Sequence, residues 1–203
     1  MEWSESPRLI LASQSAVRLA LLRRAGLNVE AHPAHLDEAE IKASARAEGA
    51  SAADAALLLA ELKAARIARR APEAMVVAAD QILVCDERWF DKPDGPEAAR
   101  EQLLALRGRT HRLVTAVLCQ VGDAVLWRHV DEPRLAMRAF SEPFLDAYLA
   151  AEGEAVTTSV GAYRLESVGA QLFDRIEGDY FSVLGLPLLP LLGFLRQHGA
   201  LAR

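Results

Sequence analysis

Apolar residues follow two different spacings along this chain, and the two spacings alternate. Continuous or alternating apolar runs predict strands over 8–12, 75–79, 82–85, 111–121, 124–129 and 135–140, with a further short strand inside 28–34. Apolar residues at helical spacing predict helices over 15–25, 51–70, 96–106, 141–152 and 187–198. Because strands alternate with helices and a glycine turn at 122–123 predicts a hairpin, we expect an α/β fold with a mixed, twisted sheet flanked by helices.

Several of these helices carry start and stop signals. Ser51, followed three residues later by Asp54, is typical of a helix N-cap. Pro96 suits the first turn of a helix, and Gly26 suits the C-terminal end of the helix before it. These signals support the predicted boundaries independently of the apolar spacing.

The first predicted strand leads into a candidate anion site. The apolar run 9–12 stops at Ser13, and the helix after it begins near Ser15 with Arg18 in its first turn. A capped helix N-terminus presents N–H groups and a positive dipole end, and an arginine adds a planar set of donors. The same pattern, taken alone, also fits an ordinary capped helix after a strand.

Other charged residues are candidates for chemistry. The apolar run 75–79 is expected to end at Asp80, and ligands of open α/β sheets bind at the carboxyl ends of strands. A carboxylate there can hold a divalent metal or act as a general base, although an ordinary turn aspartate is the alternative. Lys63 and Lys92 each fit a surface lysine when taken alone. The acidic cluster at 37–40 is expected in a loop, either solvated or as supplementary metal ligands.

Composition and charge narrow the function classes. A chain of 203 residues predicts one large domain over 1–203 or a tightly joined pair, and a net charge of -5 with interspersed acid and base predicts no nucleic-acid partner. The 2 cysteines lie in apolar runs, which favours a reducing compartment. We find no signal-peptide pattern and no apolar stretch long enough to span a bilayer, so the sequence predicts a cytoplasmic protein with no membrane partner.

Three familiar site types are not predicted. The 5 histidines have no regular spacing, so no zinc site is implied. No Gly-x-Ser-x-Gly turn surrounds Ser13 or Ser15, which argues against a covalent serine nucleophile. No Gly-x-Gly-x-x-Gly follows the first strand, which argues against a dinucleotide-binding domain.

The motifs become specific when they are taken in order. They are Leu-Ala-Ser-x-Ser-x-x-Arg at 11–18, Asp-Glu at 37–38, Lys-Ala-Ala at 63–65, Ala-Asp at 79–80, Lys-Pro at 92–93, Leu-x-Gly-x-x-His at 106–111, Val-Thr-Ala-Val at 114–117, Gly-Ala-Tyr at 161–163, Ile-Glu-Gly at 176–178 and Val-Leu-Gly-Leu-Pro-Leu at 183–188. Each is weak alone. In this order, over about residues 8–195, they resemble the Maf family of nucleoside triphosphate pyrophosphatases.

The resemblance implies a fold, a reaction and a set of partners. Maf proteins share the elongated α/β fold of the inosine triphosphate pyrophosphatases, in which two lobes flank a deep cleft. They hydrolyse a nucleoside triphosphate to the monophosphate and pyrophosphate, using Mg²⁺ or Mn²⁺. The resemblance also suggests a homodimer.

Roles for individual residues follow from the same resemblance. Asp80 matches the family's catalytic aspartate, and Glu38 matches an acidic residue near the metal, which Asp80 would share. The residues that match the phosphate-contacting positions are Ser13, Arg18, Lys63 and Lys92. Three cations and a metal suit a triphosphate better than a phosphate monoester.

Departures from the family pattern bear on the substrate. The usual Ser-Pro-Arg-Arg has Val17 in place of its first arginine, and the usual threonine after the aspartate is Gln81. Glu166 stands where the family commonly has glutamine. Gln81 and Glu166 resemble the subgroup that prefers 7-methyl-GTP over dTTP and UTP, although that subgroup usually has tryptophan at the position of Val17. The alternatives are a pyrophosphatase that prefers dTTP or UTP and a catalytically weak nucleotide-binding regulator of septum formation.

Overall fold

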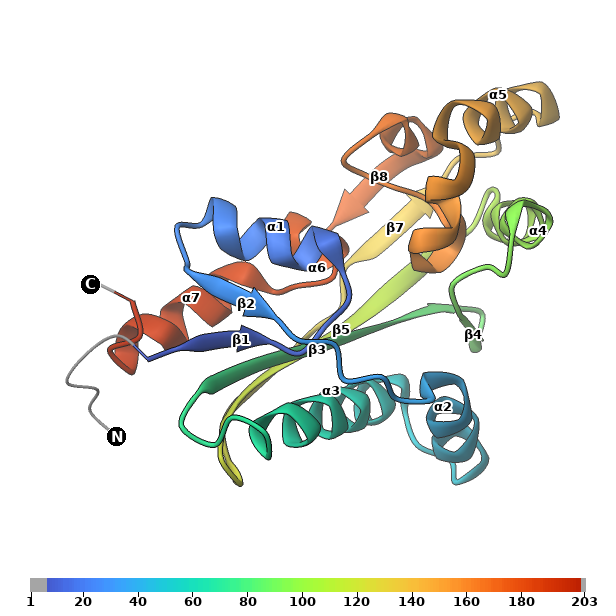
Figure 1. The fold of residues 1–203 in the computed structure, drawn as a ribbon. Coiled ribbons are helices and arrows are strands. Elements are labelled where there is room, and N and C mark those ends of the chain that lie inside the picture. Colours follow the sequence, from blue (N-terminus) through green and yellow to red (C-terminus); the bar gives the residue numbers. More distant parts are fainter. Residues whose placement is uncertain (1–6, 202–203) are drawn as a thin grey trace. The chain divides into compact units, whose positions relative to one another are not determined.

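The computed structural model describes residues 7–201, and Figure 1 shows their helices and strands. The described residues form a mixed eight-stranded sheet, in which six strands follow the order β2-β1-β3-β5-β7-β8 while β4 pairs with β3 and β6 pairs with β5. The chain divides into two compact units that are discontinuous in sequence. Among the described residues, the first unit comprises 7–80, 115–131 and 180–201, and the second comprises 81–114 and 132–179.

The strands of the first unit combine parallel and antiparallel pairing. They are β1 (Leu9–Leu11), β2 (Val29–Ala31), the first part of β3 (Met75–Cys85), the last part of β5 (Thr110–Val121) and β6 (Ala124–Asp131). The short strand β1 pairs in parallel with both β2 and β3. The strands β5 and β6 form an antiparallel hairpin, as the turn at 122–123 predicts. The mixed α/β class predicted from the sequence is therefore confirmed.

Helices cover both faces of these strands. The helices of the first unit are α1 (Ala16–Arg24), α2 (Glu38–Ala47), α3 (Ala52–Ala68), α6 (Tyr180–Val183) and α7 (Leu188–Gln197). Each of the first three begins at a polar cap whose side chain accepts a backbone N–H: Ser15, Asp37 and Ser51 respectively. Ser51 is the N-cap that the sequence predicts, and it forms a reciprocal capping box with Asp54.

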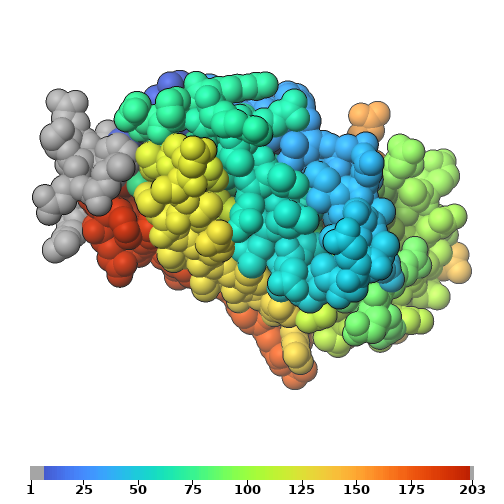
Figure 2. Space-filling view, turned by 90° about the horizontal axis from the view of Figure 1, so that it is seen from below, coloured from blue at the N-terminus to red at the C-terminus, as the bar shows by residue number. Residues whose placement is uncertain are grey.

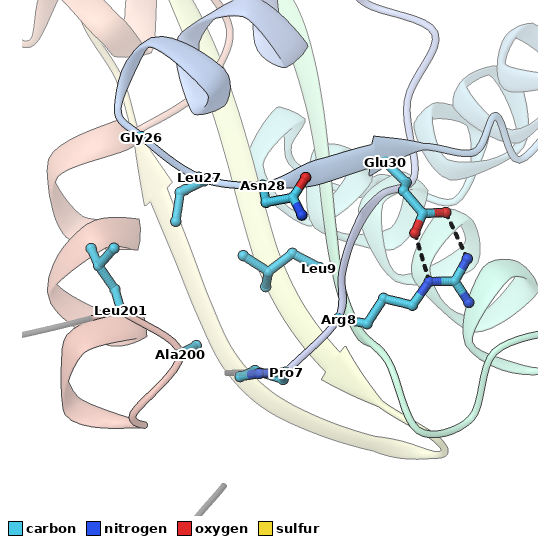
Figure 3. Close-up of a pocket in the computed structure, with 9 residues that line it drawn as sticks. All are labelled: Pro7, Arg8, Leu9, Gly26, Leu27, Asn28, Glu30, Ala200 and Leu201. Carbon is cyan, nitrogen blue, oxygen red and sulfur yellow. Dashed lines mark hydrogen bonds and ion pairs between the residues drawn. The ribbon is translucent and has the colours of Figure 1, made fainter. Parts of the chain in front are cut away.

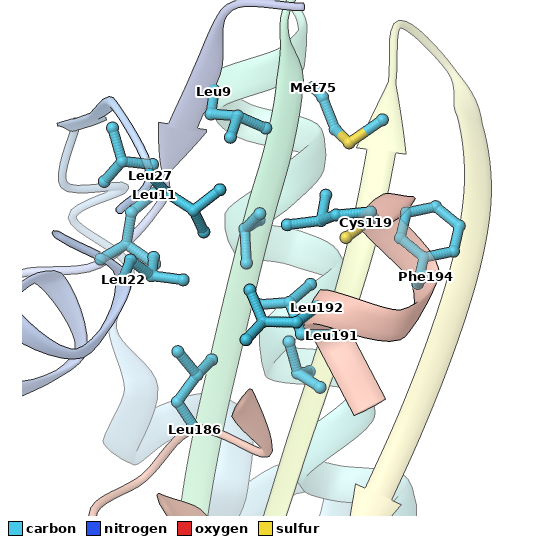
Figure 4. Packing of buried hydrophobic residues seen from close by; sticks show 14 of the residues in the cluster. Leu9, Leu11, Leu22, Leu27, Met75, Cys119, Leu186, Leu191, Leu192 and Phe194 are labelled. Atoms are coloured by element: carbon cyan, nitrogen blue, oxygen red, sulfur yellow. The ribbon is translucent and has the colours of Figure 1, made fainter. Parts of the chain in front are cut away.

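The pleat of the strands sends alternate residues into two separate cores. Leu9 and Leu11 of β1 pack with α1 and α7 in one cluster, part of which Figure 4 shows. Ile10, between them, packs in another cluster with Ala64 and Ile67 of α3. Burial on both faces explains why these strands appear in the sequence as continuous apolar runs. In Figure 2, α3 lies alongside β6 on the surface of this unit.

The second unit has its own strands and helices. These are the rest of β3 and β5, β4 (Arg88–Phe90), α4 (Pro96–Leu106), β7 (Arg134–Met137), α5 (Glu142–Glu152), the 3₁₀ segments η1 (Gly153–Thr158), η2 (Val160–Ala162) and η3 (Val168–Leu172), and β8 (Phe173–Glu177). The strand β7 pairs antiparallel with both β5 and β8. The helix α4 occupies the bounds predicted from the sequence, with Pro96 in its first turn.

Two predictions about local structure are wrong. The acidic cluster at 37–40 does not lie in a loop, because Asp37 caps α2 and Glu38 and Glu40 occupy its first turn. Carboxylates are stabilised there by the positive end of the helix dipole.

The strand predicted to end at Asp80 continues without a break to Cys85. The strand tolerates a buried carboxylate there because Asp80 has a charged partner. The short strands β4 and β8 were not predicted at all. No helix among residues 7–201 is long and apolar enough to cross a membrane.

Candidate active site

A buried ion-pair cluster joins three elements of the first unit. The Lys63 ammonium lies 2.5 Å from Asp80 Oδ1 and 2.8 Å from Glu38 Oε1. Lys63 and Asp80 are only 6% and 4% exposed, whereas Glu38 is more open. The three residues come from α3, β3 and the first turn of α2, so sequence-distant charges converge at one place.

Local periodicity explains this convergence. On β3, Asp80 shares its face with Ala78 and Val76, two and four residues earlier, both of which pack in the cluster that includes α3. On α3, Lys63 lies beside Ala60 and Ala64 on the buried face of the helix. Small residues in that helix let it approach the strand, so the lysine side chain can reach the carboxylate.

Positive charges surround the two carboxylates of this cluster. The Lys63 ammonium contacts both, and the Arg18 guanidinium interacts electrostatically with both. Burial alone would raise the pKa of Glu38, but the positive charges of Lys63, Lys42 and Arg18 hold that pKa below its ordinary value. Asp80 Oδ2 is buried and has no hydrogen-bond partner among the described residues. That oxygen is therefore the acceptor in this cluster whose hydrogen-bonding capacity is unused.

The predicted anion site adjoins this cluster in the fold. The Ser15 hydroxyl accepts the backbone N–H of Arg18 at 3.2 Å, and the Ser13 hydroxyl accepts the N–H of Ser15 at 3.1 Å. Arg18 Nη1 donates to the carbonyl oxygen of Ala79 at 2.8 Å and to Ser13 Oγ at 3.4 Å. Because Ala79 directly precedes Asp80, this bond ties the start of α1 to the carboxylate-bearing part of β3.

The Arg18 guanidinium is already partly occupied by the protein. Its Nε donates to the carbonyl oxygen of Gly185 at 2.7 Å, and its Nη1 holds Ala79. Its Nη2 has no hydrogen-bond partner among residues 7–201. Burial lowers the pKa of Arg18, and the carboxylates of Asp80 and Glu38 oppose that effect. The side chain therefore remains charged, with one nitrogen available to an anion.

Comparison with known proteins agrees with this arrangement. A family model described as Maf-like protein matches residues 8–198. The chain belongs to the Maf-like protein family. The Granulibacter bethesdensis protein named nucleoside triphosphate pyrophosphatase is 60% identical, over 96% of this chain and 98% of that protein. The Rhizobium meliloti protein named 7-methyl-GTP pyrophosphatase is 49% identical, over 96% and 98% respectively.

The structure brings together five of the residues that the Maf resemblance singles out: Ser13, Arg18, Glu38, Lys63 and Asp80. All five belong to the first unit. Two partners of Arg18, the carbonyl groups of Ala79 and Gly185, were not predicted. A backbone carbonyl cannot be recognised as a binding partner from residue type. The motif Val-Leu-Gly-Leu-Pro, which contains Gly185, was the only sequence feature that marked one of these two positions.

The remaining candidates occupy other surroundings. Val17 packs against the core shared by α1 and α7, so its side chain is partly used for packing. Gln81, Lys92 and Glu166 belong to the second unit. There, Glu166 accepts a hydrogen bond from Arg164 Nε at 3.3 Å, and Lys92 is exposed directly after β4.

Proposed function

We propose that this Maf-like protein is a nucleoside triphosphate pyrophosphatase, which hydrolyses its substrate to the monophosphate and pyrophosphate. The observation that carries the proposal is the buried cluster of Glu38, Lys63 and Asp80, with Arg18 bonded to the residue before Asp80. The names of the relatives support the same activity. A chain that only bound nucleotide would not need a buried carboxylate with a free oxygen beside its cations.

Asp80 fits the part of general base. Its Oδ1 is held by Lys63, which fixes the orientation of the carboxylate, while its Oδ2 has no partner among the described residues. A water that donates to Oδ2 would be oriented and deprotonated as its oxygen attacks the α-phosphorus. The new bond joins the water oxygen to the α-phosphorus. The bond from the α-phosphorus to the bridging oxygen breaks, and pyrophosphate leaves with that oxygen.

The cations fit the stabilisation of negative charge on the phosphates. Arg18 can donate through Nη2, the nitrogen that the protein leaves free. Lys63 can donate to a phosphate oxygen with the one N–H that its two carboxylates do not occupy. Lys92 is proposed as a third phosphate contact. Fixed positive charge is most effective where charge develops during the reaction, so these side chains should act on turnover.

The carboxylates of Glu38 and Asp80 fit a divalent cation, Mg²⁺ or Mn²⁺. Both provide hard oxygen donors, and a cation bound at the unpartnered Oδ2 of Asp80 is the alternative to a water bound at that oxygen. Among residues 7–201 there is no group of three or more candidate ligands, so substrate phosphates and water would complete the coordination. When bound, such an ion supplies charge neutralisation of the triphosphate.

We further propose a preference for 7-methyl-GTP or a related guanine nucleotide over dTTP and UTP. A carboxylate such as that of Glu166 can accept N1–H and N2–H₂ of guanine together, whereas the carbonyls of uracil and thymine would repel it. Gln81, directly after Asp80, is the second candidate for base contact. Val17 provides no aromatic ring for stacking on a methylated base, so the preference should be modest. Relatives named after 7-methyl-GTP support this choice.

We also propose a cytoplasmic location and a homodimer. Free, buried Cys85 and Cys119 suit a reducing compartment. The homodimer follows from the Maf resemblance alone, and the molar mass in solution tests it.

A nucleotide panel tests the proposed activity. Wild-type protein is incubated with Mg²⁺ and each of 7-methyl-GTP, GTP, ATP, dTTP and UTP, and both pyrophosphate and inorganic phosphate are measured. We expect pyrophosphate and the monophosphate in equal amounts, without inorganic phosphate. Nucleotide binding by calorimetry without any pyrophosphate release would contradict the proposal and favour the nucleotide-binding regulator.

A further inference from the structure

Gly185 is held firmly at the end of a short helix. Its N–H donates to the carbonyl of Ser182 at 3.0 Å, and the N–H of Leu186 donates to the carbonyl of Phe181 at 3.1 Å. The φ angle of Gly185 is +96°, a conformation that suits glycine. The next residue, Leu186, is fully buried in the core drawn in Figure 4. The carbonyl group of Gly185 therefore has a fixed position.

Arg18 lies directly against this glycine. A Cβ atom added at Gly185 would lie 3.2 Å from Arg18 Nε and 3.3 Å from Nη2, closer than ordinary van der Waals contact. The same guanidinium donates through Nε to the carbonyl of Gly185. Gly185 thus both binds the guanidinium and leaves the space that it fills. A larger residue would have to push the guanidinium aside.

This contact sets which part of Arg18 faces a ligand. The bond to Gly185 occupies Nε and the bonds to Ala79 and Ser13 occupy Nη1, so Nη2 is the nitrogen left for a phosphate. With Val17 before it, Arg18 is the only arginine in the first turn of α1. The orientation of this single guanidinium should therefore matter more than it would in a pair of arginines.

We propose that Gly185 is a positioning residue, which holds the Arg18 guanidinium so that Nη2 is presented to a phosphate of the substrate. That the phosphate belongs to a substrate rests on the proposed pyrophosphatase function. The positioning itself rests on the contacts between Gly185 and Arg18. Its action on turnover goes through Arg18, so removal of the Arg18 side chain should clearly reduce the effect of a substitution at Gly185.

The test compares Gly185→Ala with Gly26→Ala. Gly26 follows the same helix α1, has a φ of +83° and has nothing within 4 Å of an added Cβ, so it matches the backbone strain without the contact. We expect Gly185→Ala to lower kcat/KM about tenfold because a small displacement of a fixed group costs activity, whereas Gly26→Ala should change it by less than about twofold. Equal losses for the two variants would overturn the proposal.

A double-mutant cycle separates positioning from general damage. Gly185→Ala is introduced into wild type and into Arg18→Ala, and kcat, KM and the urea midpoint of unfolding are measured for each. We expect the loss of kcat and the shift of the midpoint to be clearly smaller in the Arg18→Ala background. Identical changes in both backgrounds would show that Gly185 acts through the backbone alone and would overturn the proposal.

The urea unfolding measurement in this cycle does not depend on enzymatic activity. If the wild type releases no pyrophosphate, the proposed function fails, while coupling between positions 18 and 185 in the urea midpoint still tests the positioning. Coupling in the midpoint without coupling in kcat, in an active enzyme, would overturn the catalytic part of the inference.

Discussion

Two buried polar clusters, one in each unit, differ in charge. In the first unit, Lys63 and Asp80 form an ion pair with Glu38 at its edge. In the second unit, two neutral rings form a pair, because His111 Nε2 lies 2.8 Å from the hydroxyl of Tyr163. Burial lowers the pKa of His111 to about 4 and raises that of Tyr163 well above its ordinary value, so both remain uncharged near neutral pH.

The two clusters therefore have different roles: the charged cluster is a candidate for catalysis, whereas the neutral pair belongs to the packing of the second unit. His111 and Tyr163 pack against Phe173 at ring-centroid distances of 6.0 and 4.8 Å, and no charge needs a ligand there. The first cluster keeps an unpartnered carboxylate oxygen among charged groups. Burying charged groups costs stability, and such an arrangement is typical of a functional site.

The largest effect is expected from Asp80→Asn. An amide cannot accept the proton of the attacking water and binds a cation poorly, so pyrophosphate release should fall by about 10²–10⁴-fold or more. The fold should persist, because Glu38 still pairs with Lys63. The matched control is Asp123→Asn in the exposed turn before β6. More than half of wild-type turnover in Asp80→Asn, with a native circular dichroism spectrum, would refute the role of Asp80.

The next largest effect is expected from Lys63→Met. The ammonium should stabilise the transition state most, because the leaving pyrophosphate gains negative charge there. We therefore expect kcat to fall more than KM rises. The loss should correspond to roughly 2–4 kcal/mol of transition-state stabilisation. Lys92→Ala should show the same division between kcat and KM. Arg69→Met removes a positive charge at the exposed end of the same helix and serves as control. A change confined to KM would mean that the lysines bind substrate and transition state equally.

The buried, neutral pair of His111 and Tyr163 should make the free energy of unfolding depend on pH below neutrality. The unfolded state protonates His111 near its ordinary pKa of 6.5, while the folded state resists protonation down to about 4. The unfolded state therefore binds more protons in this window. The His111 contribution to the free energy of unfolding is fully present above pH 6.5 and is lost as the pH falls, at up to about 1.4 kcal/mol per pH unit.

Urea unfolding from pH 7 to 4 measures this contribution. Relative to wild type, His111→Asn should flatten the pH dependence in that window, whereas the exposed control His35→Asn should leave it unchanged. Parallel pH profiles for wild type and His111→Asn would contradict a neutral, buried His111.

The smallest effect is expected in base choice. Glu166→Gln keeps the shape of the side chain but removes the negative charge that would repel pyrimidine carbonyls. The ratio of kcat/KM for 7-methyl-GTP to that for UTP should fall about tenfold, the scale of one lost bidentate contact. Glu154→Gln, in an exposed segment of the same unit, is the control. Equal kcat/KM for the two nucleotides in the wild type would refute the preference while leaving the pyrophosphatase proposal standing.

The parts of the structure that local sequence determines were predicted well. Caps such as Ser51 with Asp54, and the bounds of α4 opened by Pro96, depend on neighbouring residues. The strand through Asp80 was predicted to break because a lone carboxylate inside an apolar run indicates a turn. The lysine that neutralises it comes from α3, 17 residues away in sequence. Spacing alone carries no information about that contact.

The candidate site shows the same limit. The resemblance to Maf proteins identified Ser13, Arg18, Glu38, Lys63 and Asp80, and the structure adds how these residues contact one another. Glu38 was expected in a loop, whereas the first turn of α2 holds it toward Lys63. The bonds of Arg18 to two backbone carbonyls depend on tertiary packing, so no residue type in the sequence indicates them.

One measurement tests the central claim, that this cluster directs water to the α-phosphorus of a nucleoside triphosphate. Wild-type protein is given Mg²⁺ and GTP, or the best substrate of the panel, in ¹⁸O-labelled water, and the products are analysed by mass spectrometry. We expect ¹⁸O to appear in the nucleoside monophosphate and the pyrophosphate to be unlabelled. Label in the pyrophosphate, or release of inorganic phosphate with a nucleoside diphosphate, would contradict the central claim.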